Sequence, residues 1–171
     1  MIETENLVLR RPKLDDFERV HEMIRTEEVH RFLGPDHGYE DSFLRAMRNE
    51  GCWSFFGYGP FIVRERGSED FVGQCGLFHS RRGLGEDFDP FPEAGWVIDP
   101  NHWGKSYATE AMRSIIDWSK KERGIERIVA IISEGNAASV AIASKLGFSE
   151  IGEANYKGDP VMRYAWTASP A

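Results

Sequence analysis

Hydrophobic and polar positions change their spacing abruptly near Pro100, and this change predicts a strand, a turn and a helix in that order. From Glu93 to Ile98, alternate residues point to opposite faces, as in a strand, and Pro100 then ends the strand. One face carries Ala94, Trp96 and Ile98, and the other carries Glu93, Gly95 and Val97. Beyond the turn, the residues that share one face of a helix are Ala108, Ala111, Met112, Ile115 and Ser119.

The same patterns predict short elements along the whole chain. Strands are expected at 7–10, 53–56, 61–64, 71–78, 93–98, 127–132, 149–153 and 161–166, and helices at 17–24, 40–48 and 137–146 besides the one after the turn. Residues 80–92 form a long loop, and such loops in compact domains often carry function. With 41% apolar residues and no repeats or linkers, we expect one domain over residues 1–171.

The turn after Pro100 has the features of an anion site. Gly104 allows a sharp turn, so the amides from Lys105 to Ala108 can point outward at the positive end of the helix. Gly-Lys-Ser also ends a Walker A loop, but that loop needs a glycine where this chain has Asp99. A nucleotide-binding protein is therefore the least favoured alternative.

The segment resembles the acyl-CoA loop of the GCN5-related N-acetyltransferases (GNAT), whose motif is Gln/Arg-x-x-Gly-x-Gly/Ala. Here it reads Asn101-His-Trp-Gly104-Lys-Ser106, with departures at Asn101 and Ser106. The longer run Trp-Gly-Lys-Ser-Tyr-Ala-Thr-Glu-Ala, which ends at Ala111, is very similar to the RimJ/RimL branch, which acetylates the N-termini of ribosomal proteins.

A second stretch resembles the same family. A strand from Arg127, an Asn136-x-x-Ser139 helix start and a Leu-Gly147-Phe exit follow in the family's order. Asn136 suits an N-cap and Gly147 a left-handed C-terminal position, and an ordinary capped helix would share both features. The expected apolar stripe of this helix is Val140, Ala143 and Leu146.

The resemblance implies an α+β fold, in which a mixed, mostly antiparallel sheet flanked by helices splays open between the fourth strand, 93–98, and the fifth strand, 127–132. The pantetheine of acetyl-CoA would lie in that split. The residues expected to bind acetyl-CoA are Trp96, Val97, Ile98, Trp103, Gly104, Lys105, Ser106, Tyr107, Ala108, Thr109 and Asn136.

The implied chemistry is direct attack of a primary amine on the thioester, which requires a base and a dipole that stabilises the oxyanion. Glu93 is the candidate base, directly or through water, unless it is only a solvated residue at a strand start. The amide of Val97 is the candidate oxyanion donor. Many members place a tyrosine where this chain has Ala143, so Ser139 becomes the candidate acid for the thiolate, ahead of Tyr156.

Composition and residue spacing narrow the classes of ligand that this protein is expected to bind. A net charge of −7 argues against nucleic acid and would suit a cationic amine, although solubility explains it equally well. Cys52 and Cys75 lack a Cys-x-x-Cys spacing and are expected to be buried thiols. The five histidines show no spacing of metal ligands, so no metal is expected.

We therefore expect an acetyl-CoA-dependent N-acetyltransferase that acts on a protein N-terminus or a small-molecule amine. The alternative is a catalytically inactive CoA-binding sensor or assembly module. An acidic start and the lack of a long apolar run favour a cytoplasmic protein without a membrane anchor. The resemblance also allows a homodimer, although no heptad pattern marks an interface.

Overall fold

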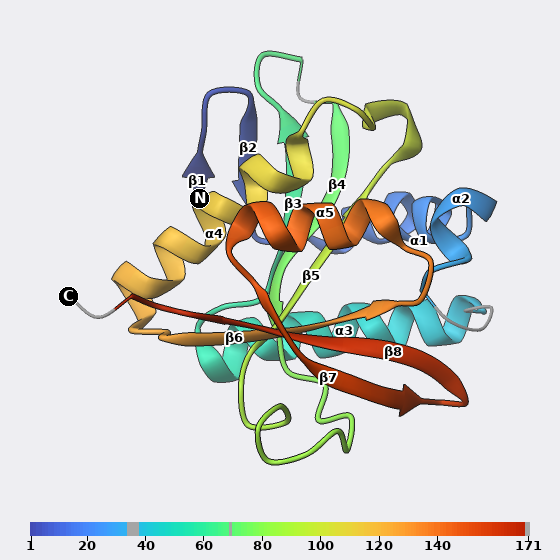
Figure 1. Ribbon diagram of the computed structural model, residues 1–171. Helices are drawn as coiled ribbons and strands as arrows, with labels where there is room; N and C mark the ends of the chain where they lie inside the picture. The colour runs from blue at the N-terminus through green and yellow to red at the C-terminus, as the bar shows by residue number, and fades with distance from the viewer. Residues whose placement is uncertain (34–37, 69, 170–171) are drawn as a thin grey trace.

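The computed structural model describes residues 1–33, 38–68 and 70–169 (Figure 1). Within these ranges, eight strands form one sheet in the order β1-β2-β3-β4-β5-β6-β8-β7. The strands are β1 (Ile2–Glu3), β2 (Leu7–Arg10), β3 (Pro60–Glu65), β4 (Phe71–Phe78), β5 (Glu93–Ile98), β6 (Arg127–Ser133), β7 (Ser149–Tyr156) and β8 (Asp159–Thr167). The helices are α1 (Phe17–Ile24), α2 (Glu27–His30), α3 (Tyr39–Phe56), α4 (Tyr107–Arg123) and α5 (Ala137–Leu146), with 3-10 turns η1 (Leu14–Asp16) and η2 (Pro100–His102).

Alternate residues on the strands face two helical layers. On β3, Phe61 and Val63 belong to the main hydrophobic cluster with α4 and α5, whereas Ile62 packs with Met23 and Ile24 of α1. In Figure 1, α4 and α5 lie on one side of the sheet and α1 to α3 on the other. The expected α+β arrangement, a sheet flanked by helices, is therefore confirmed.

The sheet opens between β5 and β6. These two strands run parallel, whereas all the other neighbouring strands of the sheet run antiparallel. β4 and β5 pair along the whole of β5, but β5 and β6 pair only where Glu93 lies opposite Val129. The expected splay is confirmed, and it leaves one backbone edge of β5 without a neighbouring strand.

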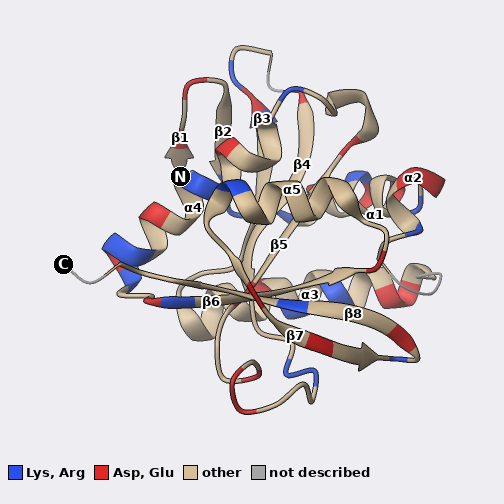
Figure 2. Ribbon diagram, in the orientation of Figure 1, with Lys and Arg blue, Asp and Glu red and all other residues tan. Residues whose placement is uncertain are grey.

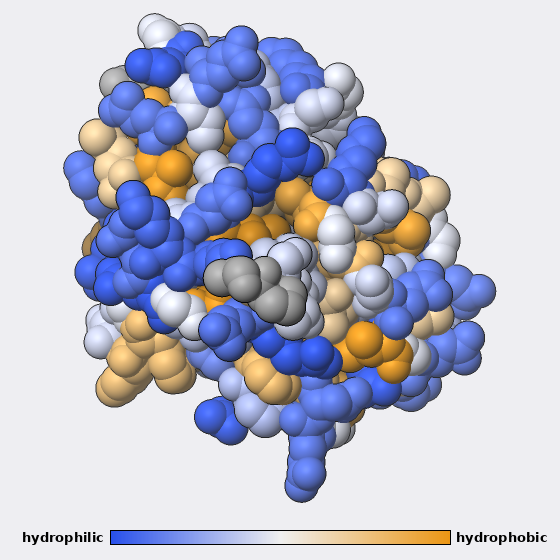
Figure 3. Space-filling model, turned by 60° about the vertical axis from the view of Figure 1, so that its left-hand side comes forward, coloured by the Kyte–Doolittle hydropathy of each residue, from blue (hydrophilic) through white to orange (hydrophobic). Residues whose placement is uncertain are grey.

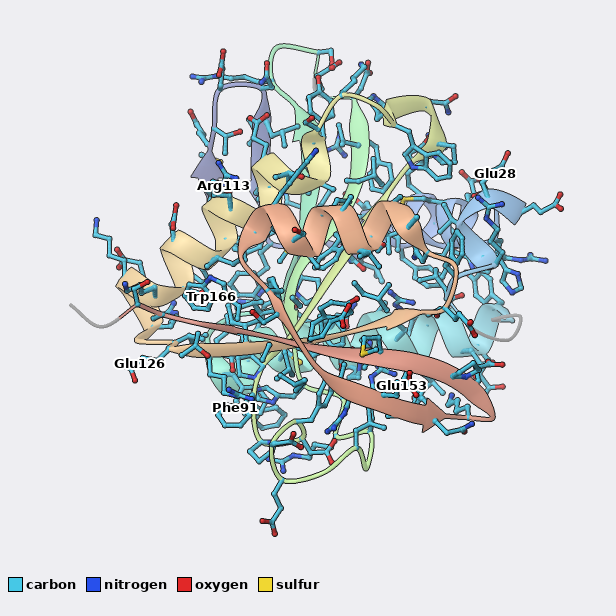
Figure 4. The ribbon with its side chains drawn as sticks, in the orientation of Figure 1. Glu28, Phe91, Arg113, Glu126, Glu153 and Trp166 are labelled. Atoms are coloured by element: carbon cyan, nitrogen blue, oxygen red, sulfur yellow. The ribbon has the colours of Figure 1, made fainter. Side chains whose placement is uncertain are left out.

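The long loop before β5 is anchored on the sheet beyond this opening. Phe88 is 2% exposed and packs with Val129 and Ala165, and Phe91 packs against the same cluster. Trp166 of β8 packs instead in the main cluster, and Figure 4 shows Phe91 and Trp166 on opposite sides of β6 and β8. The loop that leads to Glu93 is therefore fixed to the sheet by a separate small hydrophobic cluster.

Two local predictions are wrong. Residues 53–56, expected as a strand because they are mainly aromatic, are the last turn of α3, which ends where Gly57 adopts a left-handed φ of 73°. Tertiary packing overrides β propensity here, because Trp53 packs edge-on against Phe61 at 4.8 Å. In α5, Ala143 is buried as expected, but Val140 is 38% exposed and lies outside the apolar stripe.

The other expected strands form near their predicted ranges, with ends shifted by a few residues at β7 and β8. The helix expected at 40–48 is longer and runs over Tyr39–Phe56, and β1 and α2 were not predicted. Both cysteines are buried free thiols, as expected. The face in Figure 3 is mainly hydrophilic, with apolar colours in patches among the polar side chains. Within the described ranges, none of the helices combines the length and the apolar character needed to cross a bilayer.

Candidate active site

The free edge of β5 carries backbone groups that face the split. The amide of Asp99 donates to the carbonyl of Val72 at 2.9 Å, and such bonds alternate along an antiparallel pair. By this alternation Val97 turns its amide toward β4, while Trp96 and Ile98 turn theirs toward the split. The oxyanion donor expected from Val97 therefore does not face the split, whereas the neighbouring amide of Trp96 does.

Asp99 braces the turn that follows β5. Its carboxylate accepts bonds from the backbone amide and the side-chain amide of Asn101 at 3.0 and 2.9 Å, and Arg19 lies 3.1 Å away. Asn101, which departs from the family motif, thus stabilises the turn from inside. Trp103 donates its indole N–H to the carbonyl of Ile98 at 2.8 Å, which ties the turn to the strand.

The start of α4 presents free amides. Gly104 and Ser106 have left-handed φ angles of 79° and 62°, and no side chain among the described residues caps the helix. The first amides of a helix have no partner within it, so those of Tyr107, Ala108 and Thr109 remain available at the positive end of the helix dipole. This is the geometry of an anion-binding helix start.

Glu65, at the end of β3, holds two residues of this turn. The ammonium of Lys105 lies 3.1 Å from its carboxylate, and the hydroxyl of Tyr107 donates to the same oxygen. The Tyr107 hydrogen bond lowers the pKa of Glu65, and the carboxylate raises the pKa of Tyr107 to about 12. Lys105 is 45% exposed, so its ammonium can leave Glu65 for a more highly charged anion.

The start of α5 faces β5 across the split. The side-chain oxygen of Asn136 accepts the amide of Ser139 at 3.1 Å, which is the expected N-cap. The hydroxyl oxygen of Ser139 accepts the indole N–H of Trp96 at 3.2 Å. A serine that accepts a bond in this way still has its own proton to donate. The structure thus brings Trp96, Ser139 and Asn136 together.

Glu93 is buried rather than solvated, with 3% of its surface exposed. Arg82 donates to both carboxylate oxygens at 2.8 to 3.0 Å, and the hydroxyl of Ser80 donates to one of them. Burial, the largest single influence, disfavours the charge on Arg82, but the hydrogen bonds to Glu93, the negative charge of Glu93 and the interaction with Tyr156 together raise the pKa of Arg82. Arg82 therefore occupies both carboxylate oxygens, and the hydroxyl of Ser80 contacts one of them as well.

Several residues around Glu93 were missed at the level of sequence. Ser80 and Arg82 lie in the 80–92 loop, whose length was the only signal. Tyr156, the second candidate acid named from the sequence, lies on β7 with its ring centroid 4.5 Å from the guanidinium carbon of Arg82. His79 shares a hydrogen bond of 2.7 Å with the hydroxyl of Tyr58, and burial lowers the pKa of His79. In the described part of the chain, no group of three His, Cys, Asp or Glu residues could hold a metal ion.

Comparison with known proteins agrees with this geometry. The acetyltransferase (GNAT) domain family matches residues 6–149. The uncharacterized protein YkkB of Bacillus subtilis is 32% identical over 92 residues, which are 54% of this chain and 51% of that protein. The uncharacterized N-acetyltransferase YnaD of the same organism is 26% identical over 151 residues, 88% of this chain and 84% of that protein.

Solved structures share the whole fold. A GNAT-family acetyltransferase from Bordetella pertussis superposes with a TM-score of 0.85 at 28% identity, over 96% of this chain and 97% of that one. RimL, the ribosomal L7/L12 α-N-protein acetyltransferase, solved in complex with coenzyme A, superposes with a TM-score of 0.76 at 16% identity, over 96% and 95%. The expected likeness to the RimJ/RimL branch is confirmed at the level of the fold. The chain belongs to the GNAT acetyltransferase family.

Proposed function

We propose that this protein transfers an acetyl group from acetyl-CoA to a primary amine by direct attack within a ternary complex. The observation that carries the proposal is the free edge of β5, which leads directly into the anion-binding start of α4. The edge of β5 can pair with the amides of an extended pantetheine, and the start of α4 can bind the charged pyrophosphate of the same CoA molecule.

The cosubstrate would lie along this path. The backbone of Trp96 and Ile98 would pair with pantetheine, while the backbone from Lys105 to Thr109 would receive the pyrophosphate, with the Lys105 ammonium as a counter-charge. The amide of Trp96, which faces the split, would stabilise the oxyanion of the tetrahedral intermediate.

Two side chains would move the protons. The acceptor amine enters as an ammonium and must lose a proton before it attacks the thioester. Glu93 would take that proton through the hydroxyl of Ser80, because Arg82 already occupies the carboxylate directly. Ser139 would donate a proton to the departing thiolate, because its oxygen already accepts the Trp96 indole and its hydroxyl donates to no acceptor in the described part of the chain.

Thermal unfolding with acetyl-CoA, CoA, or ATP plus magnesium tests the cosubstrate, since a ligand that binds only the folded state raises the midpoint. We expect a rise with the two CoA species alone. Release of CoA thiol in the presence of an amine then tests the transfer. A rise with CoA but no thiol release with any amine would favour the binding module, and a rise with ATP alone would overturn the proposal.

A further inference from the structure

A small cavity of about 20 Å³, room for about one water molecule, opens beside β5 on the face of the sheet opposite α4. It is lined by residues of α3, β4 and β5, among them Arg45, Arg48, Gln74, Gly95 and Val97. Gly95 and Val97 alternate onto the same face of β5 as Glu93. Phe78, which lies opposite Glu93 on β4, also lines the cavity, so the cavity and the proposed base share one face of the sheet.

Positive charge in this cavity exceeds negative charge. Arg82 is matched by Glu93, but neither Arg45 nor Arg48 forms an ion pair with any residue that the structure describes. The Nε of Arg45 is closed to solvent and has no hydrogen-bond partner in the described chain. Three guanidinium groups therefore lie in the electrostatic neighbourhood of one carboxylate, which contacts only Arg82, in a protein whose net charge is −7.

The neighbouring polar groups do not supply the missing negative charge. Arg48 donates to the side-chain oxygen of Asn49 at 3.2 Å and lies 5.2 Å from the ring centroid of Phe78. Asn49 is 3% exposed, and its side-chain amide lies 3.4 Å from the oxygen of Gln74. Asn49 is a neutral amide and Phe78 an uncharged ring, so among the described residues neither Arg45 nor Arg48 has a counter-ion within ion-pair distance.

This arrangement is costly at Arg45, which is half-buried with its Nε closed to solvent, whereas the side chain of Arg48 is exposed and adds its positive charge at the surface. Taking a guanidinium out of water without a counter-charge destabilises the folded state. Burial, together with the charges of Arg48 and Arg82, lowers the pKa of Arg45 to about 10, and Glu93 only partly opposes them. An oxyanion in the cavity would relieve both the desolvation and the repulsion between the arginines.

The phosphates of CoA are poor candidates for that anion. The turn into α4 follows the end of β5 that lies farthest from Glu93, and its free amides already offer the phosphates a site of their own. The cavity and the α4 turn also lie on opposite faces of the sheet, since α3 and α4 cover different faces. Figure 2 shows the basic positions of α3 in the middle of that helix.

We propose that the acceptor is an amine that also carries an oxyanion, a carboxylate or a phosphate, which Arg45 and Arg48 bind while the amine faces Glu93. This inference rests on the proposed acetyl transfer and narrows its substrate class. Polyamines and other acceptors without an acidic group would be poor substrates, because they would add positive charge to a cavity that already has an excess.

The test compares matched amines that differ only in the acidic group. The panel is glycine against glycinamide, β-alanine against β-alaninamide, and phosphoethanolamine against ethanolamine, with spermidine as the cationic control. We expect kcat/KM, measured by release of CoA thiol, to be at least about tenfold higher for the acidic member of one or more pairs. The carboxylate and phosphate arms show which oxyanion the cavity takes.

Arginine variants separate binding from a general structural effect. Arg45→Gln and Arg48→Gln are expected to raise the KM for the acidic amine about tenfold with a smaller change in kcat, and to leave the amide nearly unchanged. Arg113→Gln, at an exposed position of α4, is the matched control and should change neither constant. Thermal melts with acetyl-CoA confirm that each variant is folded.

Each result decides between the two proposals. Equal or faster transfer to amides and polyamines would overturn the acidic acceptor and leave acetyl transfer standing. If no amine releases thiol, acetyl transfer is overturned. The cavity is then tested by the rise in melting temperature that each amine causes in the presence of CoA. A larger rise with the acidic than with the neutral member, lost in Arg45→Gln, would still support the cavity as an oxyanion site, and equal rises would overturn it.

Discussion

The two ends of β5 are built in different ways. At its C-terminal end, the turn into α4 offers mainly backbone amides, and its residues lie within one short stretch of sequence. At its N-terminal end, Glu93 is surrounded by side chains that come from α3, the 80–92 loop and β7. A backbone-built site tolerates changes of side chain, whereas a site built from charged side chains depends on each of them.

The largest expected effect lies at the side-chain end. Glu93→Gln should lower kcat by about 10² to 10⁴, the range of a general base, measured by thiol release at saturating amine. It should also destabilise the fold by about 3 to 5 kcal/mol, since Arg82 would remain buried without its partner.

Ser80→Ala separates the two roles of Glu93. It keeps the ion pair with Arg82 but removes the hydroxyl that links the carboxylate to the amine. A large fall in kcat with nearly normal stability supports the relay. If Ser80→Ala is as active as the wild type and Glu93→Gln loses only stability, Glu93 is structural and the base lies elsewhere.

The next effect tests the backbone end. Gly104→Ala places a Cβ at a φ of 79°, which costs about 1 kcal/mol or more, and we expect it to weaken acetyl-CoA binding about tenfold because the turn must keep its shape. Gly124→Ala, at the other end of α4 with a φ of 64°, introduces a similar strain far from the turn. Neither site has other atoms within 4 Å of the added Cβ, so crowding is matched.

Calorimetric titration with CoA measures this pair of variants, and thermal melts measure their stability. Both should lower the melting temperature by comparable amounts, but only Gly104→Ala should weaken binding. Equal affinities for the two variants would show that the turn does not hold the cosubstrate.

This contrast also explains what the sequence could predict. The alternation of 93–98, Gly104 and the Asn136 cap are local signals, so the sequence was enough to predict the strand, the turn and the helix starts. The cluster around Glu93 joins residues far apart in the chain, Arg45 and Tyr156 among them, and no local pattern connects them. The same reason accounts for residues 53–56, whose aromatic side chains pack from a helix rather than a strand.

A smaller effect is expected between the two ends, at Ser139. Ser139→Ala removes the proposed donor to the thiolate and leaves the Trp96 indole without its acceptor, so kcat should fall about tenfold while the affinity for acetyl-CoA changes little. Ser144→Ala, at an exposed position of the same helix, is the matched control. An unchanged kcat in Ser139→Ala would mean that the thiolate leaves without help from this residue.

The smallest expected effect concerns Cys75, which lies opposite Trp96 on β4. Burial raises the pKa of its thiol to about 12, so the reactive thiolate is nearly absent at neutral pH and appears only as the pH approaches that value. Direct transfer needs no cysteine, and we expect Cys75→Ala to keep the wild-type kcat and iodoacetamide to cause no loss of activity at pH 8. A loss of kcat in a stably folded Cys75→Ala variant, or rapid inactivation by iodoacetamide, would indicate an acetyl-cysteine intermediate and contradict the ternary complex. Retained activity would restrict the chemistry to the two ends of β5 and the Ser139 hydroxyl between them.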